Sequence, residues 1–160
     1  MQPLGFDPAQ VWTDKDNNPG FAPGERASLP DGREYVCMKA GEALGAYDCC
    51  VAEDGFDFKK ITTVLATSES LVAIAIPQQA IPQDSYGWGI TRDDRSDSDT
   101  KVNVAAQCPA FVALYTTGTA GRLDDDNGGK AVYGISTRTA QGAGIGTQPC
   151  RVVNPRSVVQ

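Results

Sequence analysis

Short β-branched segments that alternate with turn-forming residues are the feature that most constrains the fold of this chain. From Glu34 onward, runs rich in Val, Ile, Thr and aromatic residues are separated by Gly, Pro, Asn and Asp. This pattern is typical of an all-β sandwich or small barrel. The sequence lacks the apolar stripe of a long amphipathic helix, and we expect at most a short helical turn over residues 41–46. Strands are predicted over residues 34–39, 47–52, 61–67, 71–76, 86–91, 101–105, 111–115, 130–136 and 151–153.

Residues 1–32 differ from the rest because they are rich in proline and glycine and show no strand or helix periodicity. Proline fixes φ and donates no backbone hydrogen bond, so such a stretch is unsuited to a sheet interior or a helix. We therefore predict an extended Pro-rich N-terminal arm over residues 1–32. A small β-barrel or β-sandwich domain, of β-tulip or SH3-like type, is predicted over residues 33–160.

The predicted arm also carries large apolar side chains that a solvated tail would not need. They are Phe6, Val11, Trp12, Phe21 and Leu29. Two interpretations remain open from the sequence: these side chains pack on the chain's own domain, or they contact a neighbouring subunit.

Two acidic loops separate predicted strands, at residues 92–100 (RDDRSDSDT) and 123–129 (LDDDNGG). We interpret their carboxylates as solvated loop acids. The second loop fails the calcium-loop pattern that would start at Asp124, because its fifth position is Gly128 and its twelfth is Ile135 rather than Glu. Asn127 and Gly128 form a pair favoured in hairpin turns. No metal site is predicted.

Composition argues against several functions. The formal net charge is −6, and the scattered Lys and Arg residues form no basic run, so neither nucleic acid nor an anionic membrane is an expected partner. The chain has no histidine, which excludes His-dependent catalytic triads and His-containing zinc sites. The glycine run at 142–146 lacks the strand and helix of a dinucleotide-binding motif. We predict no catalytic residue, no cofactor and no enzymatic activity.

The five cysteines form neither a disulfide framework nor a CxxC metal motif. We expect buried thiols in a protein synthesised in a reducing cytoplasm, which fits an N-terminus without a signal-peptide pattern. A disulfide between Cys37 and Cys49 or Cys50 is possible but not required.

One aromatic cluster, Tyr86-Gly87-Trp88-Gly89, allows two interpretations. Alternate glycines let another group approach one face of the strand, so Trp88 belongs either to the core or to a subunit contact. The other interpretation is a platform on which sugars stack.

Four segments together resemble a known family. They are DGREYVCMKAGEALGAYDCC (31–50), IPQDSYGWGIT (81–91), KVNVAAQCPAFVALYTTGTAGRLDDD (101–126) and KAVYGISTRTAQGAGIGTQPCRV (130–152). In order and spacing they resemble the head-decoration, or capsid cement, proteins of tailed phages. The resemblance extends over about residues 31–154 and covers little of the Pro-rich arm.

The resemblance implies a non-enzymatic structural protein on the exterior of the virion capsid. Its expected partners are the major capsid protein and further copies of itself, as a homotrimer. A ligand that binds the assembled shell but not its dissociated subunits stabilises the shell. The residues we expect at capsid or inter-subunit contacts are Phe6, Val11, Trp12, Phe21, Leu29, Tyr86 and Trp88.

Two alternatives remain open. The first is a carbohydrate- or receptor-binding virion module in which Tyr86, Trp88 and Tyr133 stack against the ligand. The second is a head-completion or tail barrel protein, present in a ring of a few copies.

Overall fold

The computed structural model describes residues 6–14, 20–67 and 73–157. Within these residues the chain is all-β, with eleven strands and two short 3-10 helices, η1 (Asp54–Phe56) and η2 (Leu65–Thr67). The strands are β1 (Arg26–Ser28), β2 (Glu34–Ala40), β3 (Cys50–Ala52), β4 (Asp57–Lys60), β5 (Ile74–Pro77), β6 (Tyr86–Asp93), β7 (Lys101–Val104), β8 (Leu114–Thr116), β9 (Leu123–Asp124), β10 (Ala131–Thr137) and β11 (Gly146–Ser157). The predicted fold class, all-β, is confirmed.

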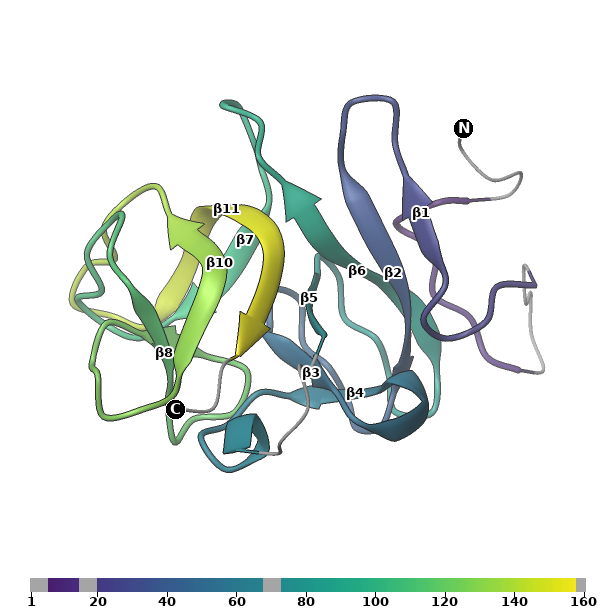
Figure 1. Ribbon diagram of the computed structural model, residues 1–160, viewed down its shortest axis with the longest axis horizontal. Coiled ribbons are helices and arrows are strands. Elements are labelled where there is room, and N and C mark those ends of the chain that lie inside the picture. Colours follow the sequence, from purple (N-terminus) through teal and green to yellow (C-terminus); the bar gives the residue numbers. More distant parts are fainter. Residues whose placement is uncertain (1–5, 15–19, 68–72, 158–160) are drawn as a thin grey trace.

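All eleven strands belong to one mixed sheet, in the order β1-β2-β4-β3-β5-β6-β11-β10-β8-β9-β7. A β2–β6 pairing closes a circuit through β2, β4, β3, β5 and β6, and a β11–β7 pairing closes a second circuit through β11, β10, β8, β9 and β7. Figure 1 shows the first circuit on the right and the second on the left. They join where β6 pairs with β11, so the sheet is not a single clean barrel.

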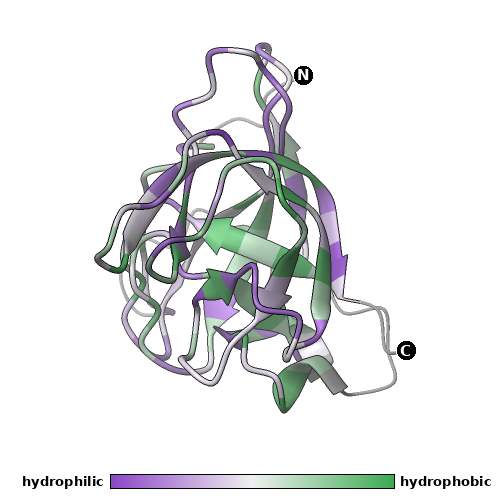
Figure 2. Ribbon diagram, turned by 90° about the vertical axis from the view of Figure 1, so that its left-hand side faces the viewer, coloured by the Kyte–Doolittle hydropathy of each residue, from purple (hydrophilic) through white to green (hydrophobic). Residues whose placement is uncertain are grey.

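One apolar core extends through both circuits. Its largest fully buried side chains include Trp88, Phe58 and Leu114. Along β11, Cys150 and Val152 are buried while Arg151 between them is exposed, as expected when successive side chains point to opposite faces. Figure 2 shows hydrophobic strand segments inside the molecule with more polar loops around them. Burial of these apolar side chains is the main term that stabilises the fold.

The strand prediction for residues 61–67 was wrong. Ile61 is fully buried outside any strand, and the chain then turns into η2, while the strand lies earlier, at β4. The hydroxyl of Thr62 accepts a hydrogen bond from the backbone N–H of Leu65, and the carbonyl of Thr62 accepts one from Ala66. Threonine can hydrogen-bond to nearby backbone, and here this local turn overrides the β-propensity of the segment.

The boundaries of several other strands differ from the predicted ones. β8 begins at Leu114 rather than at residue 111, and Phe111 has a φ of 59° that interrupts an extended strand. β5 begins at Ile74, and residues 71–72 of the predicted strand lie outside the described residues. β11 is longer than the predicted 151–153. Residues 41–46 contain no helical turn; instead Leu44 forms an isolated β-bridge with Ile81.

Asn127 and Gly128 do not form a hairpin turn. The backbone N–H of Gly128 donates to the carboxylate of Asp126 (3.0 Å), which makes a local turn. However, β9 pairs with β8 and β7, and β10 pairs with β8 and β11, so the strands on either side of this turn are not partners. The pairing of β10 with β8 is long-range, and the residues of the turn do not predict it.

The glycines of β6 give room for close packing. A Cβ on Gly87 would lie 2.7 Å from the Cδ1 atom of Ile81, and a Cβ on Gly89 would collide with Met38 and lie 2.8 Å from the Cβ of Ala75. Trp88, between them, is only 1% exposed. The alternate glycines therefore let neighbouring core side chains pack directly on the backbone of β6.

Residues 1–32 contain a strand that the sequence did not predict. β1 pairs antiparallel with β2, with Ala27 opposite Tyr35, and it stands at the edge of the sheet. An edge position suits a segment flanked by prolines, because only one side of an edge strand needs hydrogen-bonding partners. Further upstream, residues 6–14, hereafter the N-terminal strap, join the sheet through a bridge between Trp12 and Tyr86.

All five cysteines are free and buried. Cys37 on β2 lies opposite Trp88, whereas Cys50 on β3 lies opposite Lys60 and Ala75. Because β4 separates β2 from β3 in the sheet, Cys37 and Cys50 do not face each other across a hairpin. The possible disulfide between them is not formed.

Candidate interaction surface

The aromatic residues expected at a partner contact pack instead within the chain. Phe6 lies edge-on to Trp88, with ring centroids 4.7 Å apart, and Phe21 lies edge-on to the same indole at 5.0 Å. Trp12 stacks on Tyr86 at 6.0 Å. Such tilted and stacked contacts add to the burial of apolar area. These rings form an aromatic cluster under the N-terminal strap.

The strap is held to β6 by backbone hydrogen bonds as well. The N–H of Trp12 donates to the carbonyl of Tyr86 (3.0 Å), and the N–H of Tyr86 donates back to Trp12 (2.7 Å). Phe6, Trp12, Tyr86 and Trp88 are buried, and Val11, Phe21 and Leu29 pack half-buried against the core. In the folded chain most of their apolar area is therefore buried against the protein's own core. Contact of these residues with a second molecule stays a prediction.

The three aromatic residues proposed to stack on a sugar do not share a surface. Tyr86 is 9% exposed and Trp88 1% exposed, whereas Tyr133 on β10 is 45% exposed. The hydroxyl of Tyr86 is hydrogen-bonded to Asp14, which raises its pKa. The stacking platform proposed from Tyr86, Trp88 and Tyr133 is therefore absent.

An exposed surface that the sequence did not single out covers the outer side of β10 and β11. Tyr133 lies opposite Arg156, and Ser136 lies opposite Arg151, in the register of the two strands. A bulge separates these pairs at Gly134, whose φ is 83° and where a Cβ would collide with the carbonyl of Val153. The bulge places three residues of β11, 153–155, opposite the single residue Gly134 of β10.

Phe111 extends this surface beyond the strands. Its side chain is 74% exposed, and its backbone N–H donates to the carbonyl of Thr137 (3.0 Å). It lines a shallow depression of about 350 Å³ that shares Ser136 and Arg151 with a second depression of about 340 Å³. We call the surface formed by Phe111, Tyr133, Arg151, Val153 and Arg156 the Arg–aromatic face.

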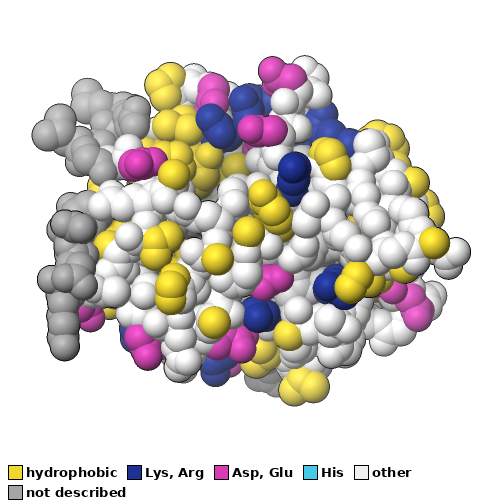
Figure 3. All heavy atoms as spheres, turned by 180° about the vertical axis from the view of Figure 1, so that it is seen from behind, with side chains coloured by type: hydrophobic (Ala, Val, Ile, Leu, Met, Phe, Trp, Pro, Cys, Tyr) yellow, Lys and Arg dark blue, Asp and Glu magenta, His cyan; other side chains and the backbone are white. Residues whose placement is uncertain are grey.

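The two arginines of the Arg–aromatic face form no ion pair with the described residues, and Asp94 lines the depression beside Phe111 and Arg151. Arg151 and Arg156 are exposed and form no ion pair with any described residue. Arg92, on the neighbouring strand, is by contrast paired with both Glu34 and Asp94. Against a net charge of −6, these two free guanidinium groups form a local cationic site. Figure 3, the view from behind relative to Figure 1, shows Lys/Arg and Asp/Glu side chains close to one another.

The loop after β6 is built around a buried carboxylate, so our interpretation of residues 92–100 as solvated acids was wrong for Asp93. Asp93 is 0% exposed. It accepts two hydrogen bonds from the Arg95 guanidinium (2.9 and 3.0 Å) and one each from the hydroxyls of Ser98 (2.6 Å) and Thr100 (2.7 Å). Burial alone would raise the pKa of Asp93, but these hydrogen bonds outweigh it and hold the pKa well below its usual range.

Arg138 ties this loop to the Arg–aromatic face. Its guanidinium donates to the backbone carbonyls of Arg95 and Ser96, and its side chain also lines the depression beside Phe111. Asp93 pairs with Val152 of β11. The loop and the Arg–aromatic face are therefore both attached to β11.

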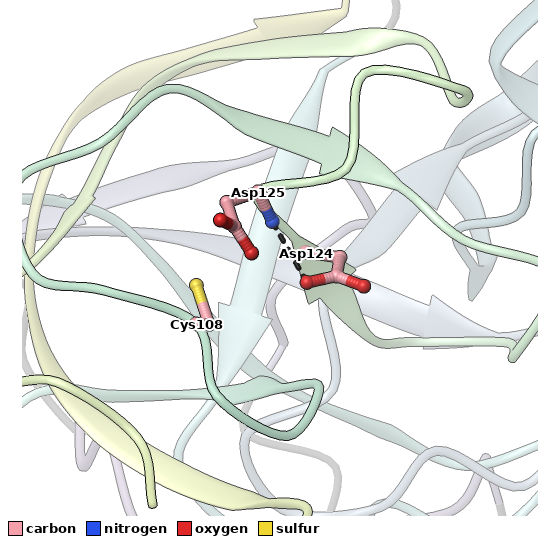
Figure 4. A group of neighbouring side chains, drawn as sticks. All are labelled: Cys108, Asp124 and Asp125. Atoms are coloured by element: carbon pink, nitrogen blue, oxygen red, sulfur yellow. Dashed lines mark hydrogen bonds between the residues drawn. The ribbon is translucent and has the colours of Figure 1, made fainter.

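Cys108, Asp124 and Asp125 bring their ligand atoms within 4.8 Å of one another (Figure 4). Burial raises the pKa of the Cys108 thiol to about 11, with further contributions from Asp125 and Asp124. Burial also raises the pKa of Asp124. A cation here would have to displace the thiol proton, and the Oδ1 atom of Asp124 already accepts the backbone N–H of Asp125 (2.8 Å). This arrangement does not define a metal centre.

The fold and the exposed groups define an all-β protein with an exposed Arg–aromatic face. Comparison of the chain with protein-family models, with curated proteins and with solved structures gave no match. Among the described residues, no helix has the length and apolar character needed to cross a bilayer.

Proposed function

We propose that this protein is a non-enzymatic decoration, or cement, protein that binds the exterior of a tailed-phage head and stabilises the shell of the major capsid protein. The observation that carries the proposal is the Arg–aromatic face, which we take as the surface that contacts the capsid. The sequence resemblance described above supports the same class of function.

The composition of the face is that of a protein-binding surface. Aromatic residues and arginine are enriched at the centres of protein interfaces, where they contribute most of the binding energy. Tyr133 and Phe111 offer apolar area, while Arg151 and Arg156 offer donors that fit carboxylates bidentately. The expected counterpart on the capsid is therefore an acidic surface with an apolar centre.

Binding that is specific to the assembled shell would stabilise the shell against dissociation. A protein that binds the assembled lattice but not free subunits stabilises the lattice by RT ln(1 + [L]/Kd) for each site, which is about 2.7 kcal/mol at one hundred times Kd. Repeated over many lattice sites, this free energy opposes the pressure of packaged DNA. Assembly of the protein as a homotrimer would add avidity, because three faces would engage neighbouring sites together.

The test is to mix the purified protein with expanded, undecorated heads and to measure bound copies together with the temperature of head disruption. We expect saturable binding at a copy number set by the surface lattice, with a raised disruption temperature. Absence of binding, or binding of a few copies without stabilisation, would refute the proposal and favour the head-completion alternative.

The role of the face is tested by the double variant Arg151→Glu/Arg156→Glu, which should lose head binding by at least about tenfold because two cationic contacts are reversed. The matched control is Arg26→Glu/Lys130→Glu, which changes the net charge equally at positions outside the face. Equal loss in both variants would show that binding depends on overall charge and not on this face.

A further inference from the structure

The turn at Asn127 and Gly128 lies between β9 and β10 and faces solvent. Both residues are exposed, and neither belongs to a strand. The strands on either side of the turn are not partners, so the pair does not serve as a hairpin turn. What remains is a chemical property of the pair: an exposed asparagine side chain is followed directly by the backbone nitrogen of a glycine.

An asparagine side chain can react with the backbone of the residue that follows it. The backbone nitrogen of that residue attacks the side-chain carbonyl carbon and closes a five-membered ring. Because the two groups belong to adjacent residues, their effective concentration is high. Glycine hinders the attack least, since it has no Cβ and the widest range of φ and ψ. The atoms nearest to a Cβ built on Gly128 are those of the Asp126 carboxylate, at 3.5 Å or more, so the turn is not crowded.

The carboxylate of Asp126 lies where it can assist this reaction. Its Oδ1 atom accepts the backbone N–H of Gly128 at 3.0 Å. A general base must lie within about 2.6–3.2 Å of the atom whose proton it takes, and Asp126 meets this requirement for the attacking nitrogen. Asp126 is exposed and forms no ion pair with any residue in the described ranges, so its carboxylate is available as a proton acceptor.

The other asparagines in the described part of the chain lack this arrangement. Asn103 lies in β7, its side-chain amide donates two hydrogen bonds (3.3 and 2.8 Å), and the next residue is a buried valine. Asn154 precedes Pro155, whose nitrogen carries no proton to give up. Asn17 and Asn18 lie outside the described residues. The three described asparagines therefore differ sharply in their expected reactivity.

We propose that Asn127 is a site of spontaneous deamidation assisted by Asp126. The Gly128 nitrogen forms a bond to the side-chain carbonyl carbon of Asn127 and gives its proton to the Asp126 carboxylate. The carbon–nitrogen bond of the side-chain amide then breaks, and ammonia leaves with the proton that Asp126 returns. Water opens the resulting succinimide at either of its two carbonyl carbons, which yields aspartate or isoaspartate without any oxidation or reduction.

The reaction changes both the charge and the backbone of the turn. It adds one negative charge to a net charge of −6, next to Asp124, Asp125 and Asp126. The isoaspartate product also routes the main chain through the former side chain of residue 127. Asp126 and Gly128 line a depression of about 300 Å³, whose shape and charge therefore change with the modification. The inference does not rest on capsid binding, because none of these residues belongs to the Arg–aromatic face.

The test is to incubate the full-length protein near neutral pH at physiological temperature and to follow each asparagine by peptide mapping with mass spectrometry. Deamidation replaces NH2 with OH, which changes the peptide mass, and chromatography separates the aspartate and isoaspartate products. We expect both products at Asn127 to accumulate at least about tenfold faster than any product at Asn103 or Asn154. Equal rates at these three positions would overturn the inference.

Three variants separate the effect of the glycine from that of the carboxylate. Gly128→Ala should slow the reaction at Asn127 at least about tenfold, because a Cβ on the attacking residue hinders ring closure. Asp126→Ala should slow it severalfold, because the attacking nitrogen loses its proton acceptor. The matched control Asp125→Ala removes the same charge from the loop but not the acceptor of the Gly128 N–H, and should react as the wild type does.

Thermal unfolding of the three variants verifies that each one folds. A wild-type rate in Gly128→Ala would refute ring closure at this turn. Equal rates in Asp126→Ala and Asp125→Ala would refute the assistance by Asp126.

Discussion

Asp93 shows how a single buried residue organises an exposed loop next to the Arg–aromatic face. Its carboxylate is removed from water, yet its oxygens are satisfied by Arg95, Ser98 and Thr100. A buried charge is tolerated when its hydrogen-bonding capacity is filled in this way. The same network orders the loop that carries Arg95 and Ser96, whose carbonyls hold Arg138 beside the Arg–aromatic face.

We expect Asp93→Asn to lower the free energy of unfolding by about 1–3 kcal/mol near neutral pH, because a neutral amide leaves the Arg95 guanidinium poorly paired. Since the pKa of Asp93 is lower in the folded chain than in the unfolded chain, its contribution is complete above the ordinary Asp pKa of about 3.9 and is lost as the pH falls below it. The wild type should therefore lose more stability between about pH 6 and about pH 3 than the variant.

Urea unfolding at the two pH values measures this difference, with Asp97→Asn, an exposed acid of the same loop, as the control. An identical pH dependence in Asp93→Asn and the wild type would contradict the assigned role.

At the scale of elements, the N-terminal strap and β10–β11 have opposite roles. The strap buries its aromatic side chains and completes the core, whereas β10 exposes Tyr133 and β11 exposes two arginines. Both behaviours depend on backbone pairing: the Trp12–Tyr86 bridge holds the strap on β6, and the bulge at Gly134 separates the cross-strand pairs of the exposed face.

We expect Trp12→Ala to lower the free energy of unfolding by about 3–5 kcal/mol, because it leaves a cavity beside Tyr86 and Trp88. Phe111→Ala removes an exposed aromatic side chain and should change stability by less than about 0.5 kcal/mol. Urea denaturation of the isolated protein, without heads, makes the comparison. If Trp12→Ala is as stable as the wild type, the strap does not contribute to the core, and its role in contacting a neighbouring subunit gains support.

At the scale of the whole molecule, one core spans both circuits of the sheet and encloses every thiol. Burial raises the pKa of Cys150 to about 12, and it raises that of Cys37 to about 12. Thiolate, not thiol, is the reactive form, so these cysteines are protected both by exclusion of reagent and by protonation.

We therefore expect the five thiols to react slowly with a disulfide reagent near pH 8 in the native protein and rapidly after denaturation in urea. Absorbance of the released thiolate measures both rates. The unfolding temperature should be the same with and without reductant, since the cysteines are free. Rapid reaction of even one native thiol would contradict the enclosed core.

The sequence by itself determined the β class of this protein and the positions of several of its strands along the chain. β2, β6, β7 and β10 follow the predicted segments closely, because runs of β-branched and aromatic residues bounded by turn-forming residues are a local property of the sequence. The glycines beside Trp88 likewise predicted a close approach to β6.

The tertiary structure alone decided the burial of Asp93, the Arg–aromatic face and a pocket beside the strap. The burial of Asp93 depends on Arg95, Ser98 and Thr100 folding back over it, and the Arg–aromatic face depends on a register that brings Tyr133 to Arg156 and Ser136 to Arg151. The pocket, lined by Pro8, Tyr47 and Lys101, forms only where the strap, the segment around residue 47 and β7 come together. The hydrogen bonds to Asp93 are local, but the pairing of Asp93 with Val152 of β11, the register of the face and the pocket all depend on long-range contacts. The free energy of such pairing comes from contacts between distant segments that no local sequence window contains.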